Sequence, residues 1–465
     1  MSTSSGDAQG VPWRDFLGEA SVASLSLVCM AVWLHAADSL VVATMLPRIV
    51  ADIGGGAYVG WTVSLYQIGS IVLGAASALL TLRLGLRLPM SAAALTFGLG
   101  CALSAMAPSM SVVLVGRTLQ GLGGGGLVSM SFIAASLLFE RRHIARVMAT
   151  ISALWGISAF LGPLLGGLFV QYATWRIGFW FFAIEALALA GLILWTAPPG
   201  RRAGSGGSFP VVRLALLSAG VVLVSEGGVV VAPLRTGALV LAGLACLALF
   251  FLSDARATES RLLPRGSLDL RQPTGAALVM IMAMSMATIA GTAYGPILLV
   301  RIHGITALEA GYVIAASSLG WTLMAILVSG APERLDRALI AIGMTVVALG
   351  LLLMVWAMPS GSVWLVALAM AAMGGGFGLS WTFILRRSTA LADGDEVQRT
   401  AGAIPVLQRL GYALGAAAIG IVANASGFLS MQGPADGAQA ARAIFLACLV
   451  PAALALVAML ALVRR

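Results

Sequence analysis

A segment in the first third of the chain, from Ser111 to Phe139, reads SVVLVGRTLQGLGGGGLVSMSFIAASLLF. It is long enough to cross a bilayer as a helix, for which about 20 apolar residues suffice. It nevertheless carries one charge, Arg117, and four consecutive glycines, Gly123 to Gly126. A charge inside an apolar span is costly and usually marks a functional or pairing site. Because glycines let a neighbouring membrane helix approach closely, the segment predicts a tightly packed helix that carries Arg117 as a charge in need of a partner.

The whole chain shares this apolar character. Of its 465 residues, 60% are hydrophobic and only 10% are charged, and the mean hydropathy is +1.00. A soluble protein would carry about 25% charged residues. The apolar runs have helical length and lack strand-like alternation, which favours helices over a barrel. The composition therefore predicts an all-α polytopic membrane protein.

Charge and cysteine content argue against several other kinds of protein. The formal net charge is +9, but all 27 basic residues are Arg and they are dispersed along the chain, so we expect no nucleic-acid partner. The four cysteines lie inside apolar runs without CxxC spacing and are interpreted as reduced, structural thiols; they are Cys29, Cys101, Cys246 and Cys448. The acids between Asp393 and Glu396 lie among arginines in a short loop, so we expect no metal and no cofactor.

Fourteen apolar spans can be drawn, the eighth of them short. They lie near 21–46, 57–80, 88–107, 111–138, 147–171, 175–197, 210–232, 235–252, 274–300, 306–330, 337–358, 362–385, 399–426 and 438–463. With a cytoplasmic N-terminus, twenty arginines fall in inner segments and five in outer segments. Cytoplasmic loops are enriched in Arg and Lys. The pattern predicts an inner (plasma) membrane protein with both termini in the cytoplasm.

The spans group into two blocks. The longest inner connections, 198–210 and 253–273, enclose spans seven and eight. We therefore expect four parts: a cytoplasmic tail (1–20), an N-terminal six-helix bundle (21–197), a linker with two inserted helices (198–273) and a C-terminal six-helix bundle (274–465).

The fourth spans of the two blocks share a short sequence. Gly121–Ile133 reads GLGGGGLVSMSFI and Ala372–Ile384 reads AMGGGFGLSWTFI, with six of thirteen positions identical. In this alignment Gly123 corresponds to Gly374. We interpret the match as the trace of a duplication, since many transporters are built from internal repeats.

Four stretches carry recognisable motifs. Residues 38–54 (DSLVVATMLPRIVADIG) place an acid before an apolar run that ends in Leu-Pro, and residues 114–124 (LVGRTLQGLGG) join an Arg to Gln-Gly. The other two are residues 156–167 (GISAFLGPLLGG) and residues 408–415 (QRLGYALG). Together they resemble the fourteen-span drug:proton antiporter family of the major facilitator superfamily. The resemblance implies the major facilitator fold, with two six-helix bundles plus two inserted central helices, and export by alternating access.

The loop between spans two and three departs from that family pattern. Residues 78–87 (ALLTLRLGLR) keep Arg83, Gly85 and Arg87, to which the resemblance assigns a role in gating. Leu82 stands where the family has an acid that helps to hold the cytoplasmic side closed. A weaker copy of the motif, GAPERLDR, follows in the second block at 330–337. The loss of the acid leaves open whether gating or transport itself is impaired.

Asp38 and Arg117 are the first candidates for proton coupling. At 1.5 Å of rise per residue, both lie about 9–12 Å below the outer edge of their spans, so an ion pair is sterically feasible. Burial and a neighbouring guanidinium act on the pKa of a carboxyl in opposite directions, which is the balance that a proton carrier needs. The pair is interpreted either as the coupling site or as a permanent structural pair. His35, one turn before Asp38, either shares the proton or packs as a hydrogen-bonded residue.

Further polar residues inside the spans are candidates for proton or substrate binding. Glu185, near the middle of the sixth span, is interpreted as a second proton site, a cation-selecting group or a neutral hydrogen-bonded side chain. Arg409 either attracts an anionic group or pins two helices. Aromatic side chains and methionines suit a pliable pocket for apolar ligands. The substrate-binding candidates are Trp33, Tyr66, Gln67, Gln120, Trp155, Tyr294, Trp321, Trp381 and Arg409.

The fifth span carries a stripe of small residues around Pro163, which removes one backbone hydrogen bond from the helix. Such a stripe suits a helix that slides against the other half, but it equally suits static packing. The candidate gating or packing residues are Gly156, Gly162, Pro163, Gly166 and Gly167.

These observations favour a proton-coupled secondary active exporter (an antiporter) of small amphipathic or lipophilic compounds, similar to multidrug-efflux proteins. We expect it to act as a monomer in the lipid bilayer, with protons and a small-molecule substrate as its partners. We do not expect an enzyme. A membrane-embedded transferase would need a sizeable outer loop with paired acids, and the outer loops of this chain are short. The alternatives are an importer or uniporter of a small metabolite on the same fold, and a transport-dead sensor or lipid-handling protein.

Overall fold

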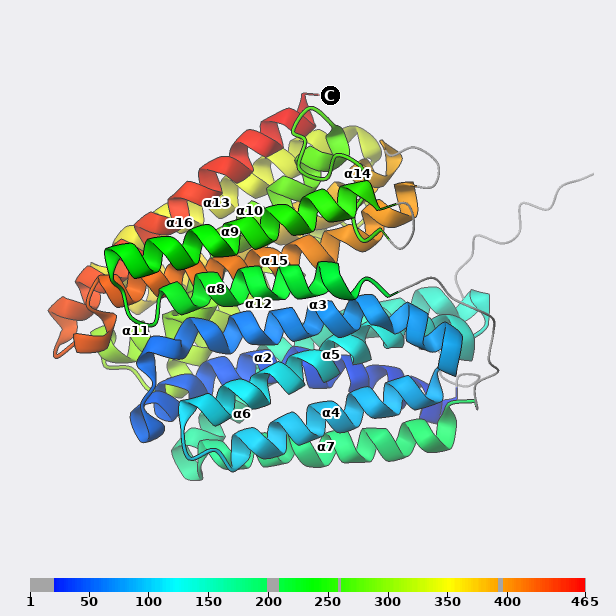
Figure 1. Ribbon diagram of the computed structural model, residues 1–465, viewed down its shortest axis with the longest axis horizontal. Coiled ribbons are helices and arrows are strands. Elements are labelled where there is room, and N and C mark those ends of the chain that lie inside the picture. The colour runs from blue at the N-terminus through cyan, green and yellow to red at the C-terminus, as the bar shows by residue number, and fades with distance from the viewer. Residues whose placement is uncertain (1–20, 199–208, 258–260, 392–395, 465) are drawn as a thin grey trace, which may run out of the picture.

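The computed structural model describes residues 21–198, 209–257, 261–391 and 396–464, and every regular element in these ranges is a helix (Figure 1). The predicted N-terminal tail, 1–20, lies outside the described residues, as does most of the first inner connection.

The helices follow one another along the chain with short connections. The first half contains α2 (Val22–Ile53), α3 (Val59–Leu84), α4 (Arg87–Ala105), α5 (Met110–Leu138), α6 (Ile144–Tyr172) and α7 (Trp175–Thr196). Two helices follow, α8 (Val211–Gly227) and α9 (Pro233–Arg256). The second half contains α10 (Pro273–Ala293), α11 (Gly295–His303), α12 (Ala307–Val328), α13 (Asp336–Ser360), α14 (Val363–Ala390), α15 (Glu396–Ala425) and α16 (Pro434–Val463). Short 3-10 turns are η1 (Gly56–Tyr58), η2 (Arg141–His143), η3 (Glu333–Leu335) and η4 (Phe428–Ser430).

Thirteen helices within the described ranges are long and apolar enough to cross a membrane, judged by length and composition. α8 has 17 residues and is not among them, so a total of fourteen spans stays a prediction. The prediction of a short eighth span was wrong, because α9 has 24 residues and the short helix is α8. The predicted ninth span is broken at Tyr294, between α10 and α11. Gly295 and Pro296 follow the break, and proline has no backbone N–H with which to continue the helix.

Buried apolar side chains form two clusters. One is built from α2 to α7, and the other is built mainly from α8 to α16. In Figure 1 the blue-to-teal helices of the first half lie together below the yellow-to-red helices of the second half; α8, in green, lies at the boundary between them, and α9, also green, lies over the second half. α8 packs against both α3 and α15 and so touches both halves.

The glycines of α5 place this helix directly against its neighbours. A Cβ on Gly121 or Gly125 would collide with the backbone of α3, and a Cβ on Gly123 would lie 2.5 Å from the carbonyl oxygen of Ala93 on α4. No side chain larger than hydrogen fits at these positions without displacing a backbone. The predicted tight helix is therefore present, wedged between α3 and α4.

The corresponding helix of the second half, α14, is packed in the same way. Gly374 and Gly378 meet the backbone of α12, and Gly376 meets the backbone of α13. By these contacts Gly121 corresponds to Gly374, so the predicted pairing of Gly123 with Gly374 was wrong by two residues. A run of glycines matches another glycine run at several offsets, and only the packing selects one.

The small-residue stripe of α6 lies against two partners. A Cβ on Gly162 or Gly166 would lie 2.7 or 2.9 Å from a side chain of α2. A Cβ on Gly167 would lie 2.5 Å from a side-chain atom of Leu308 on α12, and a Cβ on Gly156 would lie 3.5 Å from a side-chain atom of Thr322 on the same helix. Pro163 lies inside α6 without ending the helix. The stripe therefore joins the first half to the second, and its part in gating stays a prediction.

The halves also meet along α3 and α15. Ser64 Oγ donates to the carbonyl oxygen of Ala413 at 2.9 Å. Nearer the start of α3, Asn424 Nδ2 donates to the carbonyl oxygens of Ala57 at 3.1 Å and Gly228 at 2.7 Å. One amide thus joins η1, the end of α8 and α15 at the end of the bundle that we predict to be extracellular.

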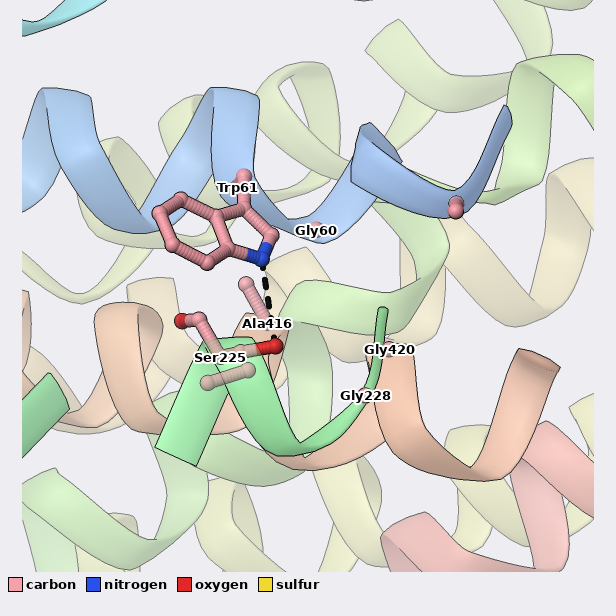
Figure 2. Close-up of a pocket in the computed structure, with 8 residues that line it drawn as sticks. Gly60, Trp61, Ser225, Gly228, Ala416 and Gly420 are labelled. Carbon is pink, nitrogen blue, oxygen red and sulfur yellow. Dashed lines mark hydrogen bonds between the residues drawn. The ribbon is translucent and has the colours of Figure 1, made fainter. Parts of the chain in front are cut away.

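Figure 2 shows this junction in detail. Trp61 Nε1 donates to the carbonyl oxygen of Ser225 at 3.1 Å, which ties α3 to α8. Gly60, Gly228 and Gly420 line the small hollow beside it, which has no room for a water molecule. The junction is therefore a packed contact between three helices and not a ligand pocket.

Candidate functional site

Asp38 and Arg117 form an ion pair in the interior of the first half. Asp38 on α2 is fully buried and Arg117 on α5 is almost fully buried, and Arg117 Nη1 lies 2.6 Å from Asp38 Oδ2. Two charges this close inside a membrane protein partly offset the cost of burying each other. The second carboxylate oxygen, Asp38 Oδ1, is buried and has no hydrogen-bond partner among the described residues.

Arg117 has further partners besides Asp38. Its Nη1 also donates to Gln120 Oε1, and its Nε donates to the carbonyl oxygen of Thr62 at 3.4 Å. Gln120 Nε2 in turn donates to Ser104 Oγ on α4 at 3.1 Å. The guanidinium is therefore held by α3 and by its own helix as well as by Asp38.

Thr62 and Ser104 were not among the site residues predicted from the sequence. Their only signal was a small polar residue inside an apolar span, and such residues are common in membrane helices.

Tyr66 lies beside Arg117, and His35 lies beside Tyr66. The guanidinium carbon is 4.2 Å from the centre of the Tyr66 ring, a cation–π arrangement. Tyr66 Oη and His35 Nδ1 are 2.8 Å apart, and the Trp155 ring stands edge-on to His35 at 5.9 Å. Because Trp155 is 45% exposed, it is the member of this cluster most accessible from outside the protein.

Glu185 does not join this cluster. Its Oε2 accepts a hydrogen bond from the indole N–H of Trp33 at 3.3 Å. Trp33 and Asp38 are five residues apart on α2, which places them on different faces of a helix with 3.6 residues per turn. The structure thus separates two acids that the sequence analysis grouped together as proton-coupling candidates.

Arg409 reaches across the boundary between the halves. From α15, its Nη1 donates to Ser70 Oγ at 2.6 Å and to the Ser70 carbonyl oxygen at 3.2 Å on α3. No carboxylate among the described residues lies within ion-pair distance of it. This contact pins the halves together in the present conformation.

The remaining substrate candidates are spread over several places. Trp321 stacks on Phe377 at 5.4 Å and lies 5.5 Å from Trp381, forming an aromatic group on α12 and α14. Tyr294 is fully buried at the break before α11, where its ring packs on Phe428. Gln67 is half-buried on α3. Tyr294 therefore offers no surface to a ligand in this conformation, while the two tryptophans are partly exposed.

The loop candidates lie together at the end of α3. Gly85 has φ of 76° and ends α3, and Arg87 begins α4. Leu82 is 56% exposed, so the leucine that replaces the family's acid buries little surface. Arg83 is also exposed.

Comparison with known proteins places the chain in a family. Residues 28–258 match the family model of the Major Facilitator Superfamily. A protein of Mycobacterium tuberculosis (strain H37Rv) named "probable multidrug-efflux transporter" is 30% identical over 466 residues, which cover 96% of this chain and 95% of the relative. The chain belongs to the major facilitator superfamily.

Other transporters are similar to this chain in sequence over a shorter region, or in fold alone. The multidrug efflux pump SdrM of Staphylococcus aureus is 27% identical over 179 residues, 38% of this chain and 39% of that protein. The crystal structure of the nucleoside transporter NupG aligns with a TM-score of 0.66 at 12% identity, covering 95% of this chain and 99% of that one. A peptide transporter aligns with a TM-score of 0.67 at 15% identity, with 93% of each chain covered. The prediction of a major facilitator fold is therefore confirmed, and the protein is a multi-pass membrane transporter rather than an enzyme.

Proposed function

We propose that this superfamily member exports small amphipathic or lipophilic compounds in exchange for protons, by alternating access between its two halves. The observation that carries the proposal is Asp38 Oδ1, a buried carboxylate oxygen without a hydrogen-bond partner, on a residue whose other oxygen is bound to Arg117. An unpartnered charged oxygen at this depth is costly. A proton on Oδ1 would neutralise the carboxylate without displacing any described hydrogen bond to that oxygen.

Arg117 has a second acceptor to hold it when Asp38 is protonated. The same Nη1 that contacts Asp38 also contacts Gln120, which Ser104 orients from α4. Loading the proton would therefore weaken the contact between α2 and α5 while leaving the guanidinium anchored on α5. This is the kind of two-state element through which a proton can change the relative stability of two conformations.

Two further observations support export as the direction. The relative that matches over nearly its full length is named for multidrug efflux, and residues 156–167 resemble the exporter motif. We propose an inner-membrane location with both termini in the cytoplasm, so that the contacts of Ser64 and Asn424 close the outer side in this conformation.

The test is a proton-flux assay in proteoliposomes across a panel of compounds, comparing wild type with Asp38→Asn. We expect substrate to evoke proton flux in wild type and the Asn variant to lose it nearly completely. Asp52→Asn is the matched control, because Asp52 is an exposed acid near the end of α2 that pairs with Arg176. Unchanged flux in Asp38→Asn contradicts the coupling role. Substrate movement without proton flux in wild type identifies the uniporter alternative instead.

A further inference from the structure

Glu185 is a carboxyl at the middle of a helix on the periphery of the molecule. It is the eleventh of the 22 residues of α7, and α7 lies along the lower edge of the molecule in Figure 1. Its neighbours Ile184 and Leu187 are 65% and 59% exposed, as side chains that face lipid would be. Ionisable residues within spans normally face the bundle interior and pair with one another, so this position is unusual.

Nothing described in the protein neutralises Glu185. No Arg or His among the described residues lies within ion-pair distance of its carboxyl group. On α4, which is packed against α7, the ionisable side chains are Arg87, the first residue of the helix, and Cys101, which is fully buried. α2 presents Trp33, with Cys29 one turn earlier, and α6 carries ionisable groups only near its ends, at Arg146 and Tyr172. The carboxyl therefore has one described hydrogen-bond donor, the Trp33 indole, on one of its two oxygens.

The surroundings of Glu185 have the chemistry of a site for an organic cation. Trp33 is half-buried beside the carboxyl, and among side chains the indole ring attracts cations most strongly. Met30 and Cys29, half-buried on the same side of α2, are polarisable side chains that adapt to the shape of a ligand. Asp38, in contrast, already has a guanidinium at 2.6 Å, which would repel a second cation.

We propose that Glu185 and Trp33 form a peripheral binding site for lipophilic cations that reach the protein from the lipid side. A cation that binds the carboxylate must displace its proton, which leaves to water, so cation and proton compete for one group. The contribution of the site to export rests on the function proposed above, whereas binding of the cation does not.

Competition for one carboxyl makes a specific prediction about pH. The apparent affinity for the cation rises with pH, by about tenfold per unit while the carboxyl is mostly protonated, because one proton is released per cation bound. A lipophilic anion of the same shape shows no such dependence on Glu185.

The experiment measures binding of radiolabelled tetraphenylphosphonium by equilibrium dialysis to the whole protein in lipid nanodiscs, at a series of pH values. Glu185→Gln is expected to weaken binding about tenfold or more, the equivalent of one lost charge contact, and to abolish its pH dependence. Glu185→Asp keeps the charge and should keep the pH dependence. Trp33→Phe should weaken binding a few-fold.

Two controls accompany these variants. Glu226→Gln, which alters an acid on α8 already paired with Arg235, should bind the cation as wild type does. Tetraphenylborate, an anion of the same shape, tests whether the site prefers positive charge.

The outcomes separate this site from the central pair. Wild-type binding by Glu185→Gln overturns the proposal, and so does a pH dependence that disappears in Asp38→Asn but not in Glu185→Gln. If Glu185→Gln loses binding while Asp38→Asn transports normally, the peripheral site stands and the coupling role of Asp38 fails. If Asp38→Asn loses proton flux while Glu185→Gln binds the cation as wild type does, the coupling role of Asp38 stands and the peripheral site fails. The melting temperature of each variant shows whether it is folded. Glu185→Asp keeps the negative charge, so it separates an effect of the charge from an effect of changing the side chain.

Discussion

Asp336 and Leu82 lie beside corresponding loops of the two halves: Leu82 is in the last turn of α3, before the loop to α4, and Asp336 is the first residue of α13, after the loop from α12. Asp336 is only 4% exposed and accepts hydrogen bonds from Nε, at 3.1 Å, and Nη2 of Arg386. Arg386 also donates to the carbonyl oxygen of Ala331 at 3.2 Å, so it ties the loop to α14. The first half has an exposed leucine where the family has its acid, whereas the weaker sequence copy of the motif forms an ion pair between Asp336 and Arg386.

The burial of the Asp336 pair, compared with an exposed ion pair elsewhere in the chain, predicts unequal effects of removing the two carboxylates. Asp336→Asn leaves Arg386 with a neutral partner in a largely buried place and is expected to destabilise the protein by about 1–3 kcal/mol. Glu140→Gln removes an acid from the exposed pair with Arg142 and is expected to cost less than about 1 kcal/mol. Thermal unfolding in detergent measures both. Equal melting temperatures for the two variants would show that the Asp336 pair does not stabilise the loop.

At the same scale, part of the polar site was predictable. Asp38 and Arg117 stand out because each is a charge inside an apolar span, and counting helical rise from the span ends places them at one depth. Gln120 was proposed only as a substrate residue, yet it joins Arg117 to Ser104. The direction in which each side chain points depends on the rotation of its helix, which residue counting does not provide.

Among the elements, α5 is the most constrained by its sequence. Its glycines permit backbone contact with α3 and α4, and the equivalent glycines of α14 do the same against α12 and α13. Contact at this distance excludes even a methyl group. The packing of these two helices therefore depends on individual glycines rather than on hydrophobicity.

The same substitution at two glycines tests this dependence. Gly121→Ala places a methyl group against the carbonyl oxygen of Tyr66 and is expected to destabilise the protein by about 1–3 kcal/mol. Gly191→Ala, on α7, meets no atom within 4 Å and is expected to be neutral or stabilising by up to about 1 kcal/mol, because alanine favours helix. The melting temperatures give the comparison. A Gly121→Ala protein as stable as Gly191→Ala would mean that α5 shifts at little cost.

On the scale of the whole molecule, the described hydrogen bonds between the halves extend from one end of the bundle to the middle of α3 and α15, where Arg409 donates to Ser70. Ser64 and Asn424 lie in the parts of α3 and α15 nearest that end, while Gly402, nearer the other end of α15, is exposed with no atom near the place of its Cβ. α8 reinforces the closed end by touching both halves. If transport proceeds by alternating access, this seam has to open once in each cycle.

A cross-link across the seam tests that requirement. In a background without the native cysteines, Ser64→Cys with Ala413→Cys, joined by a short thiol-reactive cross-linker, is expected to hold the halves together and to reduce transport at least about tenfold. Ala78→Cys with Gly402→Cys lies on the same two helices, at exposed positions nearer the other end, and is expected to cross-link less readily. Full transport by the cross-linked Ser64 and Ala413 pair would mean that the seam never opens.

The amino-acid sequence by itself determined that this chain forms apolar helices, roughly where they begin and end, and which spans carry charges. These are local properties, set by the length and hydrophobicity of each segment. The overall fold was predicted from the resemblance of four sequence motifs to those of known transporters. The tertiary structure decided that Glu185 joins Trp33 instead of Asp38, that the glycine repeat is offset by two residues, and that the ninth span breaks at Tyr294. Each of these depends on how helices distant in sequence rotate and pack, and similar apolar segments satisfy many arrangements until side chains and backbones come into contact.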